Sequence, residues 1–281
     1  MSTAAVSMTL DQRLAAVPPF PAVGLELMAM VTNDDVGIED VVAAVRRDPT
    51  LAAKVLRYAN SATLMRSQAA ESVHDAVRTL GVVGSLRYLT TQLSATTLAA
   101  GAAGYGQDGR KLWMDAVVGA RAAQAVAGLV EVSGHVAYTA ALLRDIGKMA
   151  LTGDVSRFQD QLVTQATAIA DFTDAERAVF ETAHPELGAE LARRWRFPDP
   201  LVEAIRWHHR PSAATKHHQI VAAVHLGDVI AAMAGATGVD GFLTPLDPTA
   251  LRTLGLDDDA IIDVVIQAAQ WSQELAELDD A

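Results

Sequence analysis

The chain has 281 residues, of which 51% are hydrophobic and only 5% aromatic, and it carries a formal net charge of −12. Proteins that bind duplex nucleic acid usually present a basic face, so this charge argues against nucleic acid and against an anionic membrane surface as partners. Cysteine is absent, which excludes disulfides and thiolate metal sites. The N-terminus lacks a signal-peptide pattern, and charged residues interrupt every apolar run before it reaches the length of a membrane span. We therefore expect a globular protein of the cytoplasm.

Ala, Leu and Val dominate the composition, which favours closely packed helices over sheets. The first clear helix carries an apolar stripe over residues 38–45. Asp48 is expected to cap the next helix, and Pro49 to occupy its first turn. Ser72 and Asp75 are spaced as a capping box at the start of a further helix. These signals predict a helical N-terminal half.

Gly81 is the predicted end of that further helix, and a leucine-rich helix follows it through Leu98. The helix, glycine turn and helix over residues 73–93 could pass for a DNA-binding helix-turn-helix. Arg87 is the one strong phosphate or guanine partner on the second helix, so we interpret the segment as two core helices joined by a turn. Beyond it, the glycine-rich stretch 101–109 is the clearest predicted loop and the best internal boundary.

The rest of the chain keeps a helical period, and no pattern typical of strands occurs in it. Further helices are expected at residues 110–130, 134–146, 155–169, 173–183, 185–196, 199–208, 216–234 and 258–277. The last of these is the one helix expected in the segment 235–281, where it should pack on the bundle. The sequence thus predicts an all-α fold.

Three carboxylates lie on otherwise apolar helical stripes. Asp115, Asp145 and Asp228 each have apolar neighbours three or four residues away. An unpaired buried charge costs several kcal/mol, so these side chains need partners. A metal ion, Arg144 or nearby histidines could fill that role.

Several histidines stand near predicted helix ends. His184 precedes a helix start, and the pair His208-His209 closes another helix. Each of them is more often a satisfied structural residue than a ligand when judged by composition alone. His217 and His218 are expected at a solvated helix start. Two more histidines have no evident partner: His74 and His135.

Short motifs in a fixed order carry a resemblance to known families. Four blocks in the C-terminal half resemble the motif series of the HD superfamily, which contains metal-dependent phosphohydrolases. These blocks are residues 145–148, 183–189, 205–209 and 224–228. Three blocks in the N-terminal half resemble more specifically the HDOD family, the HD-related output domain. These blocks are residues 17–23, 45–61 and 76–81.

The resemblance implies a particular domain organisation. It covers residues 14–232 and implies a multi-helix bundle with an HD-like helical core. A helical N-terminal half would occupy residues 14–100, and the degenerate HD-like core residues 110–232. A helical extension would follow at residues 233–281.

The resemblance also implies where HD-type metal ligands would stand. The first histidine of the family falls near Asp115, the His-Asp pair on Arg144-Asp145, and the distal acid on Asp228. A guanidinium has no lone pair for a metal and repels cations, so Arg144 departs from the pattern. We hypothesise that Arg144 lies over the three carboxylates as a fixed cation through a bidentate pair. The implied vestigial site is Asp115, Arg144, Asp145, His184, His208, His209 and Asp228.

Regulation without catalysis is the function that this resemblance implies. We expect a bacterial signal-transduction module, a pseudoenzyme with no cofactor and no metal, that acts through protein–protein or small-ligand binding. Its partners would be signalling proteins, including those of cyclic-dinucleotide networks, and the sequence leaves an oligomer open. No Gly-Tyr-Pro element follows Asp145, as it would in the HD-GYP phosphodiesterases.

Two alternatives remain open from the sequence. One is a residual metal-dependent phosphohydrolase or phosphodiesterase of the HD superfamily. Its metal ligands would be Asp115, Asp145, His184, His208 and Asp228. The other is a DNA-binding regulator that uses the helices at residues 73–93, which the net charge disfavours.

Overall fold

The computed structural model describes residues 8–61, 69–102, 105, 109–169, 171–235 and 244–277. Every regular element within these ranges is a helix, so the predicted all-α class is confirmed. None of the helices in the described ranges is both long and apolar enough to cross a bilayer.

Local capping signals position the N-terminal helices. These helices are α1 (Leu10–Ala16), α2 (Ala22–Val31), α3 (Ile38–Val45), α4 (Pro49–Ala59) and α5 (Val73–Ala102). Asp48 accepts hydrogen bonds from the backbone N–H of Thr50 and Leu51 at 2.9 and 3.1 Å, so the predicted cap of α4 is confirmed. Ser72 Oγ likewise accepts from the Asp75 N–H at 3.1 Å. The Asp75 carboxylate, however, bonds the Ser72 hydroxyl at 2.7 Å in place of a backbone N–H.

Gly81 is a kink within α5, where a helix end was predicted. Its φ of 72° and ψ of 168° lie outside the helical region, and a glycine adopts such a positive φ without the strain of a side chain. The leucines after the kink, Leu86 and Leu89, are buried among the N-terminal helices. This face packs inside the protein, as the reading of 73–93 as core helices predicts.

The predicted loop at residues 101–109 starts later than expected. Residues 101 and 102 still belong to α5, and α6 already begins at Gly109. Between them the structure describes Tyr105, which is buried and donates a hydrogen bond to Glu176. The other residues between the two helices lie outside the described part of the chain.

Seven further helices build the central part of the fold. They are α6 (Gly109–Gly128), α7 (Gly134–Leu142), α8 (Lys148–Ala168), α9 (Phe172–Phe180), α10 (His184–Arg194), α11 (Asp199–Trp207) and α12 (His218–Met233). Two predicted boundaries were wrong. The helix expected to run to residue 146 ends at Leu142, so Arg144 and Asp145 lie in a turn. The helix expected from residue 155 begins at Lys148 and kinks at Phe158.

Within residues 244–277, the described part of the C-terminal segment, lie two α-helices where one was predicted. They are α13 (Thr249–Leu254) and α14 (Ile262–Glu277), with a short 3₁₀ turn (Asp259–Ile261) before α14. Six residues show too little periodicity to reveal α13 in a sequence. Val264, Ala268 and Leu275 of α14 are buried in the main core, so this helix packs on the bundle as expected.

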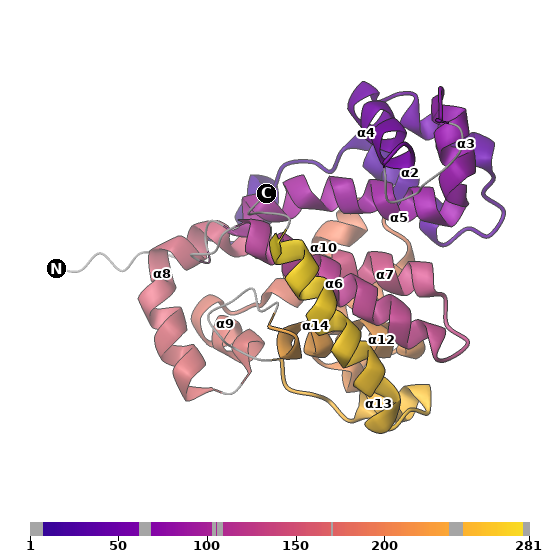
Figure 1. The fold of residues 1–281 in the computed structure, drawn as a ribbon. Coiled ribbons are helices and arrows are strands. Elements are labelled where there is room, and N and C mark those ends of the chain that lie inside the picture. The colour runs from indigo at the N-terminus through magenta and orange to yellow at the C-terminus, as the bar shows by residue number, and fades with distance from the viewer. Residues whose placement is uncertain are drawn as a thin grey trace.

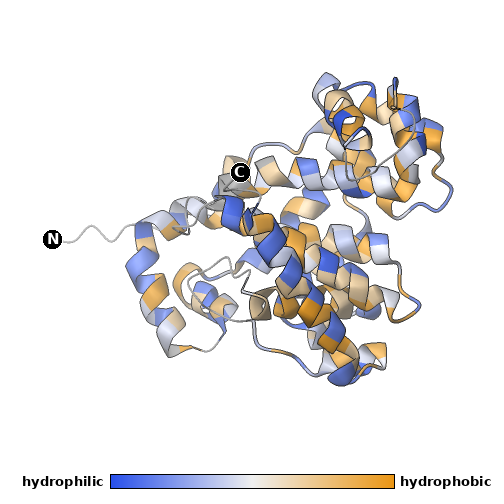
Figure 2. Cartoon of the chain, in the orientation of Figure 1, coloured by the Kyte–Doolittle hydropathy of each residue, from blue (hydrophilic) through white to orange (hydrophobic). Residues whose placement is uncertain are grey.

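Three hydrophobic clusters hold these helices together. The largest lies around α6, α7 and α12, the second among α2 to α5, and the third among α1, α8, α9 and α10. Helix α5 contacts α3 and α4 as well as α6 and α8, and it crosses from the N-terminal helices to the rest of the molecule (Figure 1). Hydrophobic and hydrophilic residues alternate along the helices, as expected of amphipathic segments (Figure 2).

Candidate functional site

The guanidinium of Arg144 is fully buried and faces three carboxylates. Its Nη2 donates to Asp115 Oδ2 at 2.5 Å and its Nε to Asp228 Oδ1 at 2.6 Å. Its Nη1 donates to the carbonyl oxygen of Ala141 at 3.0 Å, and Asp145 Oδ2 lies 3.5 Å from Nε. Arg144 therefore bridges two carboxylates from different helices, and the bidentate pair that we expected with one carboxylate was wrong.

A glycine makes room for this guanidinium. Asp115 and Gly119 lie one turn apart on α6, and a Cβ added to Gly119 would stand 2.8 Å from Arg144 Nη1. A Cβ added to Gly227 of α12 would come within 2.5 Å of the Gly119 carbonyl oxygen. The two helices thus approach closely enough for Arg144 to reach a carboxylate on each.

Lys148 supplies a second buried cation. Its Nζ lies 2.8 Å from Asp145 Oδ1, and only 8% of its side chain is exposed. Burial alone would lower the pKa of Lys148, but the carboxylate of Asp145 outweighs that effect and raises it. Lys148 belongs to the motif at residues 145–148, but the sequence alone indicated no role for it.

The three carboxylates differ in their affinity for protons. Burial raises the pKa of Asp115 to about 7; Arg144 opposes this rise, and the charges of Asp228 and Asp145 add to it. Burial also acts to raise the pKa of Asp228 and Asp145. Arg144 outweighs it at Asp228, and Lys148 together with Arg144 outweighs it at Asp145, so both pKa values lie below the ordinary range. Two cations therefore balance two ionised carboxylates, and Asp115 exchanges its proton near neutral pH.

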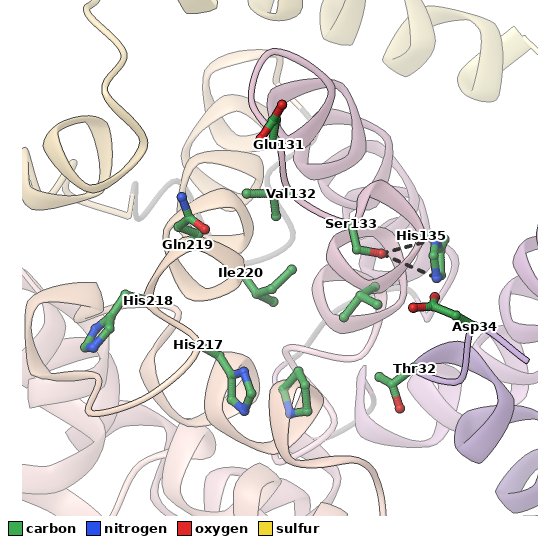
Figure 3. Close-up of a pocket in the computed structure, with 12 residues that line it drawn as sticks. Thr32, Asp34, Glu131, Val132, Ser133, His135, His217, His218, Gln219 and Ile220 are labelled. Atoms are coloured by element: carbon green, nitrogen blue, oxygen red, sulfur yellow. Dashed lines mark hydrogen bonds between the residues drawn. The ribbon is translucent and has the colours of Figure 1, made fainter.

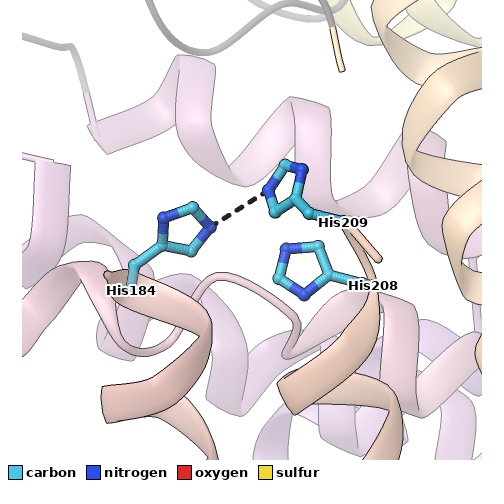
Figure 4. Close-up of side chains that lie close together, drawn as sticks. All are labelled: His184, His208 and His209. Carbon is cyan, nitrogen blue, oxygen red and sulfur yellow. Dashed lines mark hydrogen bonds between the residues drawn. The ribbon is translucent and has the colours of Figure 1, made fainter. Parts of the chain in front are cut away.

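The three predicted histidines lie together beside this cluster (Figure 4). His184 Nε2 is 3.2 Å from His209 Nε2 and 3.3 Å from Asp145 Oδ1. Its Nδ1 is 2.7 Å from Glu176 Oε2, and Glu176 also accepts from the Tyr105 hydroxyl at 2.7 Å. Sequence reasoning missed Glu176 and Tyr105, because α9 reads as an ordinary amphipathic helix and Tyr105 lies in a glycine-rich stretch.

His208 has a free lone pair inside the protein. Its Nδ1 donates to the carbonyl oxygen of Ile205 at 2.9 Å, so Nε2 is the unprotonated nitrogen. That Nε2 is buried and has no hydrogen-bond partner among the described residues. Burial lowers the pKa of His208 well below its ordinary value and that of His209 to about 3, so both rings are neutral. His225 Nδ1 donates to the His208 carbonyl oxygen at 2.6 Å and so helps to hold the backbone of His208 in place.

The donor atoms fall into two groups, each with its atoms within 4.8 Å of one another. One group is the three carboxylates and the other the three histidines. An HD-type metal would need the carboxylates, but the guanidinium of Arg144 already lies against them. A cation and a guanidinium repel each other at such distances, so the residues present do not fit that metal.

The chain is similar in sequence and in fold to known proteins. The HDOD domain family matches residues 17–211 of the chain. The chain belongs to the HDOD domain family. A curated, uncharacterised protein of Treponema pallidum is 26% identical over 233 residues, which span 79% of this chain and 43% of that protein. The chain thus spans less than half the length of this relative, and the predicted bounds at residues 14, 232 and 233 stay predictions.

Solved structures share the fold of this HDOD chain. An HDOD domain protein of unknown function from Geobacter sulfurreducens has a TM-score of 0.75 at 24% identity, over 95% of this chain and 99% of that one. A structure from Marinobacter aquaeolei VT8, named as a proposed signal transduction protein, has a TM-score of 0.78 at 21% identity. The match spans 98% of this chain and 61% of the Marinobacter chain. These likenesses establish an HD-like helical fold.

Because His208 and His209 are neutral in the folded protein, we expect the histidine cluster to stabilise the fold less at acidic pH. The unfolded chain binds a proton at His209 below its ordinary pKa of 6.5, whereas the folded protein does so only at about 3. The contribution of His209 to the free energy of unfolding is therefore fully present above pH 6.5 and is lost as the pH falls toward 3. We expect His209 to account for a loss of about 2 kcal/mol between about pH 7 and about pH 5.

Urea unfolding of the wild type and of His209→Gln at the two pH values measures this loss. The variant should lose about 2 kcal/mol less than the wild type, and the opposite contribution of Asp115 is present in both proteins and cancels. His218→Gln, at an exposed position on α12, is the matched control. Equal pH dependence of His209→Gln and wild type would contradict the assignment.

The remaining histidines lie away from the cluster. His217 and His218 are exposed at the start of α12, as predicted. They line a cleft of about 580 Å³ with His135, which lies 3.2 Å from the Ser133 hydroxyl (Figure 3). His74 pairs with Glu39 at 3.0 Å. The structure thus supplies partners for His74 and His135 that the sequence did not indicate.

Proposed function

We propose that this chain is a non-catalytic regulatory module of signal transduction, which acts by binding a protein or a small ligand. One observation carries the proposal: the Arg144 guanidinium hydrogen-bonds Asp115 and Asp228, the acids that the family resemblance assigns to a metal. Arg144 supplies the positive charge that lets these carboxylates remain buried. It offers no open coordination position at which a water could be activated.

The kind of partner follows from the charge and the family. A chain with a net charge of −12 is suited to protein or small-ligand partners more than to nucleic acid. Membership of the HDOD family and the signalling name of the Marinobacter structure support bacterial signalling proteins as partners. Proteins of cyclic-dinucleotide networks belong to this class, and we place the module in the cytoplasm.

A residual phosphohydrolase is the second candidate, and the histidine cluster favours it. The three histidines His184, His208 and His209 have ring nitrogens within 4.8 Å of one another. Among the described residues, His208 Nε2 has no hydrogen-bond partner for its lone pair. Neutral imidazoles are ordinary ligands of zinc, iron and manganese. Against this candidate, Arg144 and Lys148 hold two positive charges next to the same site.

The metal content of untagged protein separates the two candidates. We expect less than about 0.1 transition-metal ion per chain by elemental mass spectrometry, because Arg144 occupies the carboxylate group. We also expect hydrolysis of bis(4-nitrophenyl) phosphate at the background rate. About one ion per chain, together with hydrolysis that a chelator and His208→Gln both abolish, would establish the phosphohydrolase.

A further inference from the structure

A second pocket lies where the N-terminal helices meet the main core. It has a volume of about 340 Å³ and is lined from five helices, including Tyr58 of α4, Arg87 of α5, Arg121 of α6 and Tyr138 of α7. A neighbouring hollow of about 250 Å³ shares Arg87 and Arg121 and adds Trp271 of α14. The two arginines therefore stand between two adjoining hollows.

Both guanidiniums are available to an anion. Arg87 is exposed, and its Nη1 donates to the neutral side chain of Gln124 at 3.3 Å; among the described residues it forms no ion pair. Arg121 lies 3.8 Å from the carboxylate of Glu274, which is 67% exposed, so this pair is weak and screened by water. Two such cations at one pocket stand out in a chain of strongly negative charge.

Aromatic rings form another part of the wall, beside polar and aliphatic side chains. Tyr58 and Tyr88 stack with their centroids 4.1 Å apart and their planes 2° from parallel. The Tyr88 hydroxyl donates to the Lys54 carbonyl oxygen at 3.1 Å, which fixes this pair. Trp113 also lines the pocket, and its buried indole N–H has no acceptor among the described residues. The pocket thus offers aromatic rings beside the two guanidiniums.

We propose that this pocket binds a phosphorylated nucleoside of mononucleotide size. Guanidiniums bind phosphate through paired hydrogen bonds, and planar bases stack on aromatic faces. Arg87 and Arg121 would hold the phosphate, while the base would lie beside the Tyr58–Tyr88 stack and Trp113. The volume falls within the range of small-molecule sites.

The position of the pocket gives such a ligand a regulatory role. Tyr58 belongs to the N-terminal helices, whereas Arg121 and Tyr138 belong to the main core. A bound nucleotide would contact both parts and favour one arrangement of them. The inference deepens the proposed regulatory function by naming a ligand class, and it does not depend on the Arg144 cluster.

Equilibrium dialysis with radiolabelled AMP and GMP tests the assignment on the full chain. We expect saturable binding of one nucleotide per chain. Arg87→Gln should weaken it about tenfold or more, because a hydrogen bond to a charged group is lost. Arg78→Gln removes the same charge from the same helix outside the pocket and should leave binding unchanged. Thermal melting of both variants checks that they fold.

Competition with inorganic phosphate and with adenosine identifies the ligand class. We expect each to displace the nucleotide at least about tenfold less well than unlabelled nucleotide, because each makes only part of the contacts. No saturable binding up to about 1 mM, equal effects of Arg87→Gln and Arg78→Gln, or phosphate that competes as well as the nucleotide would overturn the proposal. Any of these results would leave the measurements on metal content and Arg144 unaffected, so the two proposals fail separately.

Discussion

Arg144→Ala is expected to lower the free energy of unfolding by about 3–5 kcal/mol, because it leaves buried carboxylates without their cation. The wild-type guanidinium is wholly buried and bonds Asp115 and Asp228 at 2.5 and 2.6 Å. For a chain of this size, such a loss should reduce Tm by roughly 5–8 °C. Thermal and urea unfolding, followed by circular dichroism at neutral pH, measure both quantities.

Arg78→Ala is the matched control for this experiment. Arg78 is 67% exposed and pairs with Asp75 at 3.3 Å, so its loss should change stability by less than about 1 kcal/mol. Asp228→Asn in the Arg144→Ala background should recover part of the loss, because it removes one of the uncompensated charges. An Arg144→Ala protein that melts with the wild type would show that Arg144 does not stabilise the cluster.

Hydrophobic periodicity and helix-capping residues predicted helices correctly where the signal spans only a few residues. The cap at Asp48 and the apolar stripe of α3 act over a few residues, and the structure has both. The early end of α7 could not be predicted, because residues up to Ile146 continue the apolar pattern. A Cβ on Gly147 would stand 1.9 Å from the His184 carbonyl oxygen, so a contact with α10 dictates this turn.

The candidate site was accessible to sequence reasoning because buried charges need partners. Three acids on apolar stripes pointed to a shared cation, and the structure places Arg144 among them. The bridging geometry depends on how closely α6 and α12 approach at Gly119, which no local pattern encodes. Glu176 was missed for the same reason, since only the folded chain brings it to His184.

Arg144→His is expected to create a metal site in this protein. The substitution removes the guanidinium and puts an imidazole next to three carboxylates whose oxygens lie within 4.8 Å of one another. His184, His208 and His209 form a second donor group beside them. Imidazole and carboxylate donors suit manganese, iron and zinc. We expect about one ion per chain by elemental mass spectrometry after growth and dialysis, against less than about 0.1 for the wild type.

Thermal unfolding with and without Mn²⁺ gives a readout independent of any activity. At a free concentration of about 100 times Kd, binding stabilises the folded state by about 2.7 kcal/mol, so Tm of Arg144→His should rise by roughly 5 °C or more. Arg144→Asn is the matched control, because it also removes the charge but supplies no imidazole. If both variants bind metal equally, loss of the cation alone opens the site. If neither binds, the carboxylates and histidines of this chain are no longer arranged to hold a metal, and restoring one ligand is not enough.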